Sequence, residues 1–216
     1  MKGIIQELKV LLKTKSIGTN SDRALLLDFQ ATLEIKPEKA IKLEKDALAQ
    51  IENITADNAR LVSNLHANLG GLYRMNGHPD LAREHMEKSI SLLDQFNLLH
   101  INDSIPQIAN YAMFLTEQQE PERGISELQK LSGIIKEYHS DDCLDYAKVQ
   151  ETLGTIYLMT ANLPQAKTHF KRAFKIYEKI WADEPEMIEA KYQEIQELYP
   201  QIGFCIGKNL SGLLTK

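Results

Sequence analysis

The chain has 216 residues, of which 43% are hydrophobic and 25% charged, and its formal net charge is −5. This composition is typical of globular proteins and argues against a largely disordered chain. The acidic balance argues against non-specific nucleic-acid binding, which needs a basic surface, and no apolar run approaches the about 18 residues of a membrane helix.

The compartment is predicted from the cysteines and the N-terminus. The two cysteines, Cys143 and Cys205, provide neither a disulfide framework nor a metal-binding quartet. The N-terminus carries charges too early for a signal peptide. We therefore expect a cytoplasmic location.

The hydrophobic periodicity predicts helices throughout, beginning with an N-terminal helix over about 2–14 and a polar link to residue 20. Helical hairpins are then expected over about 21–54, 59–97, 103–139 and 143–182. A further helix begins near Pro185 and ends or kinks at Pro200. A last short helix over 201–214 is expected to cap the final repeat.

The second hairpin has a clear pattern of apolar residues, glycine and proline. The apolar residues of its first helix fall three or four positions apart, which places them on one helix face: Leu61, Leu65, Leu69, Leu72 and Met75. Gly77 suits the left-handed position that ends such a helix. Pro79 follows at the start of the next helix, where its missing N–H is not needed.

These landmarks recur at a step of 42 residues. Prolines stand at positions 37, 79 and 121, and a small residue recurs at Ala40, Ala82, Gly124 and Ala166. Small residues allow the two helices of one hairpin to approach closely. Because a single hairpin cannot bury its apolar face, the copies are expected to stack on one another.

The motif within each copy resembles the tetratricopeptide repeat (TPR), in which Leu-Gly-x-x-Tyr is followed by Ala-x-x-x-Phe. The fourth copy has Leu153, Gly154 and Tyr157, then Ala166 and Phe170, and the second copy is nearly as good. The long step is similar to that of kinesin light chains. The first copy departs from the pattern, because Asp28 and Ala31 replace the glycine and the tyrosine.

The resemblance implies an all-α fold, a right-handed α-α superhelix (TPR-like solenoid) of about four to five helical hairpins. We expect one domain over 1–216, with an N-terminal helix and link (1–20), four repeats (21–182) and C-terminal capping helices (183–216). The family further implies a non-catalytic scaffold that binds a protein or peptide in a concave groove lined by the first helix of each pair.

The position before the repeat leucine lies off the apolar stripe and holds Asn68, Asn110 and Thr152 in successive copies. In long-repeat relatives an Asn here hydrogen-bonds the peptide backbone, and a carboxamide offers both a donor and an acceptor. With neighbouring positions added, the predicted groove residues are Asn64, Asn68, Arg74, Asn110, Lys148 and Thr152. The alternative interpretation is that these are simply solvated polar positions.

The sequence provides no organised catalytic chemistry. No histidine pair has the spacing of a zinc-binding helix, and no glycine-rich phosphate loop follows a strand pattern. His85 and His169 occupy the same place in two copies, which favours a structural role. We therefore expect no catalytic residue, no metal and no cofactor.

Two other functions stay open at this point. The chain could be a structural module that self-associates through its terminal helices, with a homodimer formed through the apolar C-terminal segment from Ile202. It could also be a regulatory peptide sensor of a bacterial signalling system. Such sensors often carry a DNA-binding or effector region, and residues 1–20 are too short for either, so this alternative ranks last.

Overall fold

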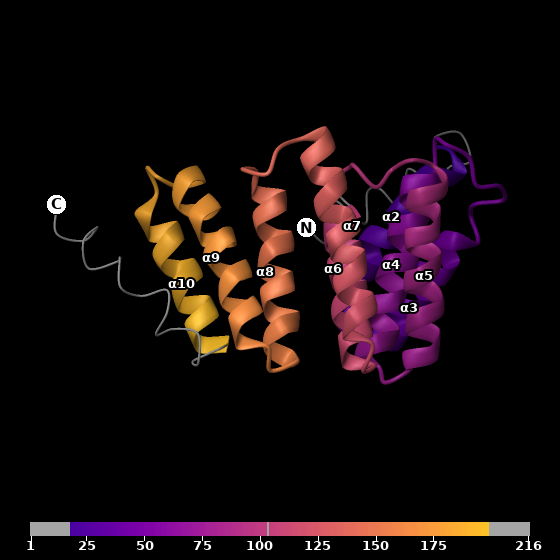
Figure 1. The fold of residues 1–216 in the computed structure, drawn as a ribbon. Coiled ribbons are helices and arrows are strands. Elements are labelled where there is room, and N and C mark those ends of the chain that lie inside the picture. The colour runs from indigo at the N-terminus through magenta and orange to yellow at the C-terminus, as the bar shows by residue number, and fades with distance from the viewer. Residues whose placement is uncertain (1–17, 103, 199–216) are drawn as a thin grey trace. The chain divides into compact units, whose positions relative to one another are not determined.

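A computed structural model describes residues 18–102 and 104–198, and within these ranges the chain contains nine helices and no strand (Figure 1). Their bounds are α2 (Asn20–Thr32), α3 (Pro37–Leu48), α4 (Ala59–Met75), α5 (Pro79–Gln95), α6 (Ser104–Glu117), α7 (Pro121–Tyr138), α8 (Leu144–Met159), α9 (Leu163–Ile180) and α10 (Pro185–Leu198). The helices predicted over 2–14 and 201–214 lie outside the described residues.

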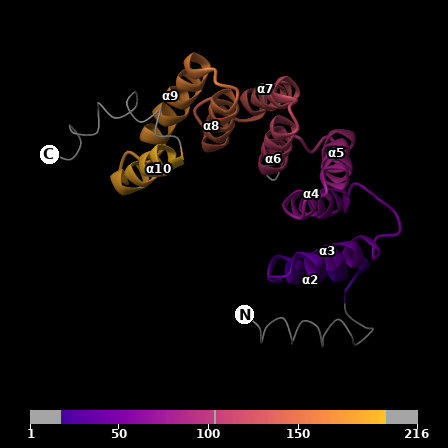
Figure 2. The same ribbon diagram turned by 90° about the horizontal axis from the view of Figure 1, so that it is seen from below.

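The helices come in pairs that match the predicted hairpins. Helices α4 and α5 run side by side in both views, as do α8 and α9 (Figures 1 and 2). Helices α3, α5 and α7 each begin at a proline, Pro37, Pro79 and Pro121, and α9 has Pro164 as its second residue. The repeated prolines therefore mark the start of each second helix, as the spacing predicts.

The first helix of three hairpins ends in the same way. The second residue after the helix is left-handed, at Gly77, Gln119 and Ala161, with φ of 75°, 66° and 58°. The next N–H donates back five residues, from His78 to the Tyr73 carbonyl at 2.9 Å, and its repeats at 120 and 162 do the same. This bond pattern satisfies carbonyl groups that the helix end leaves without partners. The left-handed conformation, which glycine adopts most easily, is thus filled by a glycine at only one of these three helix ends.

The small residues of the repeat lie where helices approach closely. A Cβ added to Gly124 would lie 2.6 Å from the Ala112 carbonyl oxygen, and one added to Gly154 would lie 2.8 Å from the Phe170 ring. At Gly70 the added atom would be 2.5 Å from Met86 Cγ. These distances are shorter than van der Waals contact, so the hairpins require small residues here.

The chain divides into two compact units, Met1–Tyr111 and Ala112–Lys216, with the boundary inside α6. The first unit buries Ala24, Ala47 and Leu65 in one cluster, with other leucines and an isoleucine around them. In the second unit the Phe174 ring stacks on Tyr192 at 4.2 Å between centroids. The expectation of a single domain over the whole chain stays a prediction. No helix in the described part of the chain has the length and apolarity to cross a membrane.

Candidate binding pocket

The predicted groove residues lie on the first helices of three hairpins. Asn64, Asn68 and Arg74 are on α4 and Asn110 is on α6, all four within the first unit. Lys148 and Thr152 are on α8 in the second unit. The predicted groove residues therefore fall into two groups, one in each unit.

Three of the predicted residues line one pocket of the first unit. This pocket, called the amide pocket below, has a volume of about 370 Å³. Its lining residues come from α2, α4 and α6: Asp28, Asn64, Ala67, Asn68, Pro106, Gln107 and Asn110. Arg74 lines an adjoining pocket of about 240 Å³, which shares Ala67, Gln107 and Asn110 with the amide pocket. Four of the six predicted residues therefore lie along one continuous surface.

Asn68 has an internal role that the sequence did not predict. Its Nδ2 donates to Asp28 Oδ1 at 2.8 Å and to Glu44 Oε1 at 3.2 Å. The Asn68 side chain therefore bridges α2 and α3, and among the described residues its Oδ1 accepts no hydrogen bond. Its donor is used within the protein, and its acceptor is available to a ligand in the amide pocket.

Asp28 and Glu44 form a carboxyl pair behind Asn68. Glu44 is 1% exposed, and its Oε2 has no hydrogen-bond donor among the described side chains. Burial and the charge of Asp28 raise the pKa of Glu44 to about 8. Burial also raises the pKa of Asp28, although hydrogen bonds from Glu44 and Asn68 oppose that rise. At neutral pH Glu44 therefore keeps its proton, which it can donate to the Asp28 carboxylate.

The carboxyl pair differs from the residues at the same two positions of the later repeats. Asp28 is one step of 42 residues before Gly70, and Glu44 is one step before Met86. In the later copies these positions make the close glycine contact with Met86 or Phe170. Asp28 is visible in the sequence as a departure from the motif. The apolar equivalents of Glu44, which are Met86, Leu128 and Phe170, are the signal that could have revealed its burial.

A second buried polar network lies behind Asn64. Gln107 Oε1 accepts from the hydroxyls of Ser63 and Ser89, whose oxygens are 2.8 and 2.6 Å away. Gln107 Nε2 donates to Asn64 Oδ1 at 2.5 Å. The bond from Gln107 uses the Asn64 acceptor, whereas no described residue accepts a hydrogen bond from the Asn64 Nδ2. Asn64 thus presents a donor where Asn68 presents an acceptor.

Asn110 and Arg74 complete the surface. Asn110 is exposed, and its side chain forms no hydrogen bond with the described residues. Arg74 is half-buried beside Met75, whose side chain is 82% exposed. The surface therefore combines carboxamides with one guanidinium and one apolar side chain.

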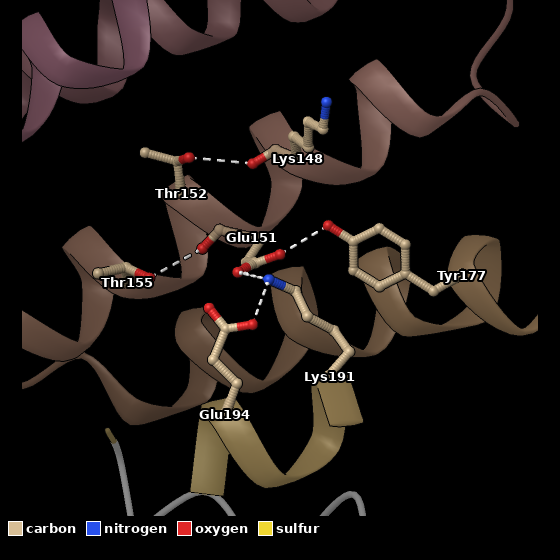
Figure 3. Close-up of polar contacts among 7 residues, drawn as sticks. All are labelled: Lys148, Glu151, Thr152, Thr155, Tyr177, Lys191 and Glu194. Carbon is tan, nitrogen blue, oxygen red and sulfur yellow. Dashed lines mark hydrogen bonds and ion pairs between the residues drawn. The ribbon is translucent and has the colours of Figure 1, made fainter. Parts of the chain in front are cut away.

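In the second unit the two predicted residues lie on α8 beside a different polar network (Figure 3). Thr152 Oγ1 donates to the Lys148 carbonyl at 3.0 Å, and the Lys148 ammonium lies 3.8 Å from Asp145. The Thr152 hydroxyl is therefore satisfied within its own helix. The bond uses only the backbone carbonyl of Lys148, and Lys148 is exposed on α8.

Glu151 is the centre of the polar contacts in Figure 3. Its carboxylate accepts from the Tyr177 hydroxyl at 2.6 Å and pairs with Lys191 at 2.8 Å, and Lys191 also contacts Glu194 at 3.0 Å. Burial and Glu151 together raise the pKa of Tyr177 well above its ordinary value. Glu151 therefore connects α8 to α9 and α10 instead of presenting an unpaired charge to a ligand.

The repeated histidines stack on the repeated tyrosines. The His85 ring lies 5.4 Å from Tyr73 and the His169 ring 5.2 Å from Tyr157, both in stacked orientation. His85 also contacts His66 through their Nδ1 atoms at 2.9 Å. Burial lowers the pKa of His66 to about 4, so this pair is neutral at physiological pH. Within the described ranges no three potential ligands are placed to hold a metal ion.

Comparison with known proteins agrees with this architecture. The tetratricopeptide repeat family matches residues 104–179. No curated protein sequence matches the chain significantly. Among solved structures, BtubC (BKLC) from P. vanneervenii superposes with a TM-score of 0.72 at 17% identity, over 97% of this chain and 86% of that one.

A putative kinesin light chain of Podosopora anserina, with nearly identical TPR-like repeats, gives a similar result. The structure of a point variant of these repeats has a TM-score of 0.67 at 14% identity, over 84% of this chain and 90% of that one. A second structure of the repeats has a TM-score of 0.64 at 15% identity, with coverages of 83% and 90%.

Residues 104–179 therefore match the tetratricopeptide repeat family in sequence. The fold is an all-α, TPR-like superhelix, as the 42-residue pattern predicts.

Proposed function

We propose that this protein is a non-catalytic interaction scaffold that binds an extended protein segment along the amide pocket. The TPR fold supports a scaffold in general terms, because proteins of this family chiefly bind other proteins or peptides. Fold alone does not fix function, so the proposal rests on one observation about the pocket. Asn64, Asn68 and Asn110 line the same pocket, and the internal hydrogen bonds leave both donors and acceptors there unused.

An extended peptide backbone needs such groups. Each of its residues presents an N–H and a C=O, and a groove that satisfies them offsets the loss of their hydration. In this proposal the Asn64 Nδ2 donates to a peptide carbonyl and the Asn68 Oδ1 accepts from a peptide N–H. Asn110 can do both. Lys148, Thr152 and Arg74 stay predictions as ligand contacts.

The variant for the test follows from the internal contacts. Asn68→Ala would remove the donor that holds Asp28 and Glu44, so a loss of binding could reflect damage to the fold. Asn110 has no such internal bond, so Asn110→Ala changes the pocket alone. Gln129→Ala removes an exposed carboxamide from α7 outside the pocket and is the matched control.

The experiment selects peptides from a random display library on the wild-type protein and measures their affinities for the variants. Asn110→Ala should weaken binding about two- to tenfold, because one hydrogen bond contributes about 0.5–1.5 kcal/mol. Gln129→Ala should leave binding unchanged, and both variants should melt like the wild type. Equal affinities for Asn110→Ala and wild type would show that the amide pocket is not the binding surface.

Self-association through the C-terminal segment stays a prediction, because residues 199–216 lie outside the described part of the chain. The cytoplasmic location also stays a prediction. No observation on the described residues favours the peptide-sensor alternative.

A further inference from the structure

We propose that the amide pocket receives the guanidinium group of an arginine side chain from the bound segment, with Asp28 as its counter-ion. This inference rests on the proposed function, because it names the chemistry of the segment that the pocket selects. It is carried by the charge of the pocket, its hydrogen-bonding groups and the buried carboxyl behind it.

The pocket has a negative charge that no cation in residues 18–102 and 104–198 balances. Asp28 is the one ionisable residue among the seven that line the pocket. Among the described residues no lysine or arginine forms an ion pair with Asp28 or with Glu44 behind it. A carboxylate that is partly removed from water without a cation is costly, and an incoming cation relieves that cost.

The hydrogen-bonding groups of the pocket favour a donor-rich ligand. The Asn68 Nδ2 is used on the two carboxyls, and the Gln107 Nε2 is used on Asn64. The Asn68 and Asn110 oxygens and the Asp28 carboxylate therefore stay available as acceptors, and the acceptors include the one charged group of the pocket. The unused donors are the neutral amide groups of Asn64 and Asn110. A guanidinium has five N–H donors in a plane and accepts nothing, which suits a pocket with several acceptors.

The buried carboxyl of Glu44 lies behind the pocket. Its side chain is 1% exposed, and its Oε2 has no hydrogen-bond partner among the described side chains. It contacts Asn68, which lines the pocket, and occupies the position where later copies have Met86, Leu128 and Phe170. An apolar residue would pack there without a desolvation cost. Because Glu44 is neutral at neutral pH, Asp28 carries the charge of the pair, and a cationic ligand offsets the desolvation of that one charge.

The first experiment uses small probes, so it does not depend on peptide binding. N-acetylarginine methylamide and its citrulline counterpart, which has nearly the same shape and no charge, are titrated into the full-length protein. The side-chain amide signals of Asn64, Asn68 and Asn110 are followed by NMR. The arginine probe should shift these signals, and the citrulline probe should shift them at least about tenfold less at equal concentration.

Asp28→Asn should weaken the arginine probe about tenfold or more, because a hydrogen bond to a charged group is worth more than a neutral one. Asp46→Asn removes the same charge from an exposed position on α3 and should have no effect. Should Asp28→Asn fail to fold, the comparison of the two probes on the wild type still decides the question. Equal shifts with both probes, or shifts confined to amides elsewhere, would overturn the proposal.

The selected peptides separate this inference from the proposed function. Two results together would support both proposals: the selected peptides contain an arginine, and Asp28→Asn binds them no better than peptides without it. Peptides that depend on Asn110 but have no basic residue would leave the proposed function standing and overturn the arginine site. If the arginine probe shifts the pocket amides but peptide affinity is unchanged by Asn110→Ala, the arginine site stands and the proposed function is overturned.

Discussion

At the scale of single residues, the most unusual feature is a carboxyl pair in the place of a packing contact. Asp28 and Glu44 stand where the later copies bring a small residue against a large apolar one. The pair is held by Asn68, and Glu44 is buried. Because burial disfavours the ionised form, the stability of the fold should depend on the protonation of Glu44.

Glu44→Gln should change the pH dependence of stability. The pKa of Glu44 is about 8 in the folded protein against an ordinary value of 4.5, so the folded state holds a proton that the unfolded state has already lost. The resulting contribution to stability is complete below about pH 4.5 and disappears as the pH rises through about 8. Glutamine has nearly the same shape as a protonated glutamate and can also form hydrogen bonds, but it does not titrate.

The free energy of unfolding of the wild type should therefore fall relative to Glu44→Gln by a few kcal/mol between pH 5 and 9. Urea unfolding of both proteins at several pH values measures this difference. Glu38→Gln on the exposed face of the same helix is the control and should run parallel to the wild type. A constant difference between wild type and Glu44→Gln across this range would contradict the assignment.

At the scale of helices, packing decides which small residues matter. Gly124 and Gly133 lie on the same helix, α7, and both lower its intrinsic helix propensity. Gly124 is buried against the Ala112 carbonyl, whereas an added Cβ at Gly133 meets nothing within 4 Å. The two glycines therefore provide a matched pair.

Gly133→Ala should stabilise the protein by about 0.5–1 kcal/mol, because alanine is the better helix former. Gly124→Ala gains the same propensity but forces α6 and α7 apart, and should destabilise by about 1–3 kcal/mol. Chemical unfolding of both variants measures the two changes. Stabilisation by both substitutions would show that α6 and α7 do not approach as closely as described.

The sequence predicts this helix architecture well because its signals are local. A proline at a helix start and an apolar face depend on residues within one or two turns. The left-handed helix ends at Gln119 and Ala161 were harder to predict, since neither residue prefers that conformation. In the sequence, only the step of 42 residues from Gly77 indicates this conformation.

At the scale of the whole molecule, each hairpin should respond mainly to its neighbours. In repeat proteins the stability is approximately a sum of terms for single repeats and adjacent interfaces. The described polar networks fit this view, because the bonds of Glu151 stay within α8, α9 and α10. A local defect should therefore have local consequences.

Gly154→Leu provides the corresponding test. The added side chain begins 2.8 Å from the Phe170 ring, so it should destabilise α8 and α9 by a few kcal/mol through overpacking. Hydrogen exchange should accelerate in α8, α9 and α10 while the amides of α2 to α5 keep their wild-type protection. An equal loss of protection in every helix would show instead that the chain unfolds as one cooperative unit.

The sequence by itself determined the repeat, the hairpins and the resemblance to the tetratricopeptide repeat, because each depends on the spacing of residues along the chain and not on tertiary contacts. It also named Asn68 and Asn110 as one repeat position and added Asn64 from a neighbouring position. Only the tertiary structure decided that these side chains share a pocket and how their donors and acceptors are used. Asn68 reaches Asp28 across 40 residues of sequence, and such a contact depends on how one hairpin packs on the next. That packing, and not the local pattern, gives the pocket its charge.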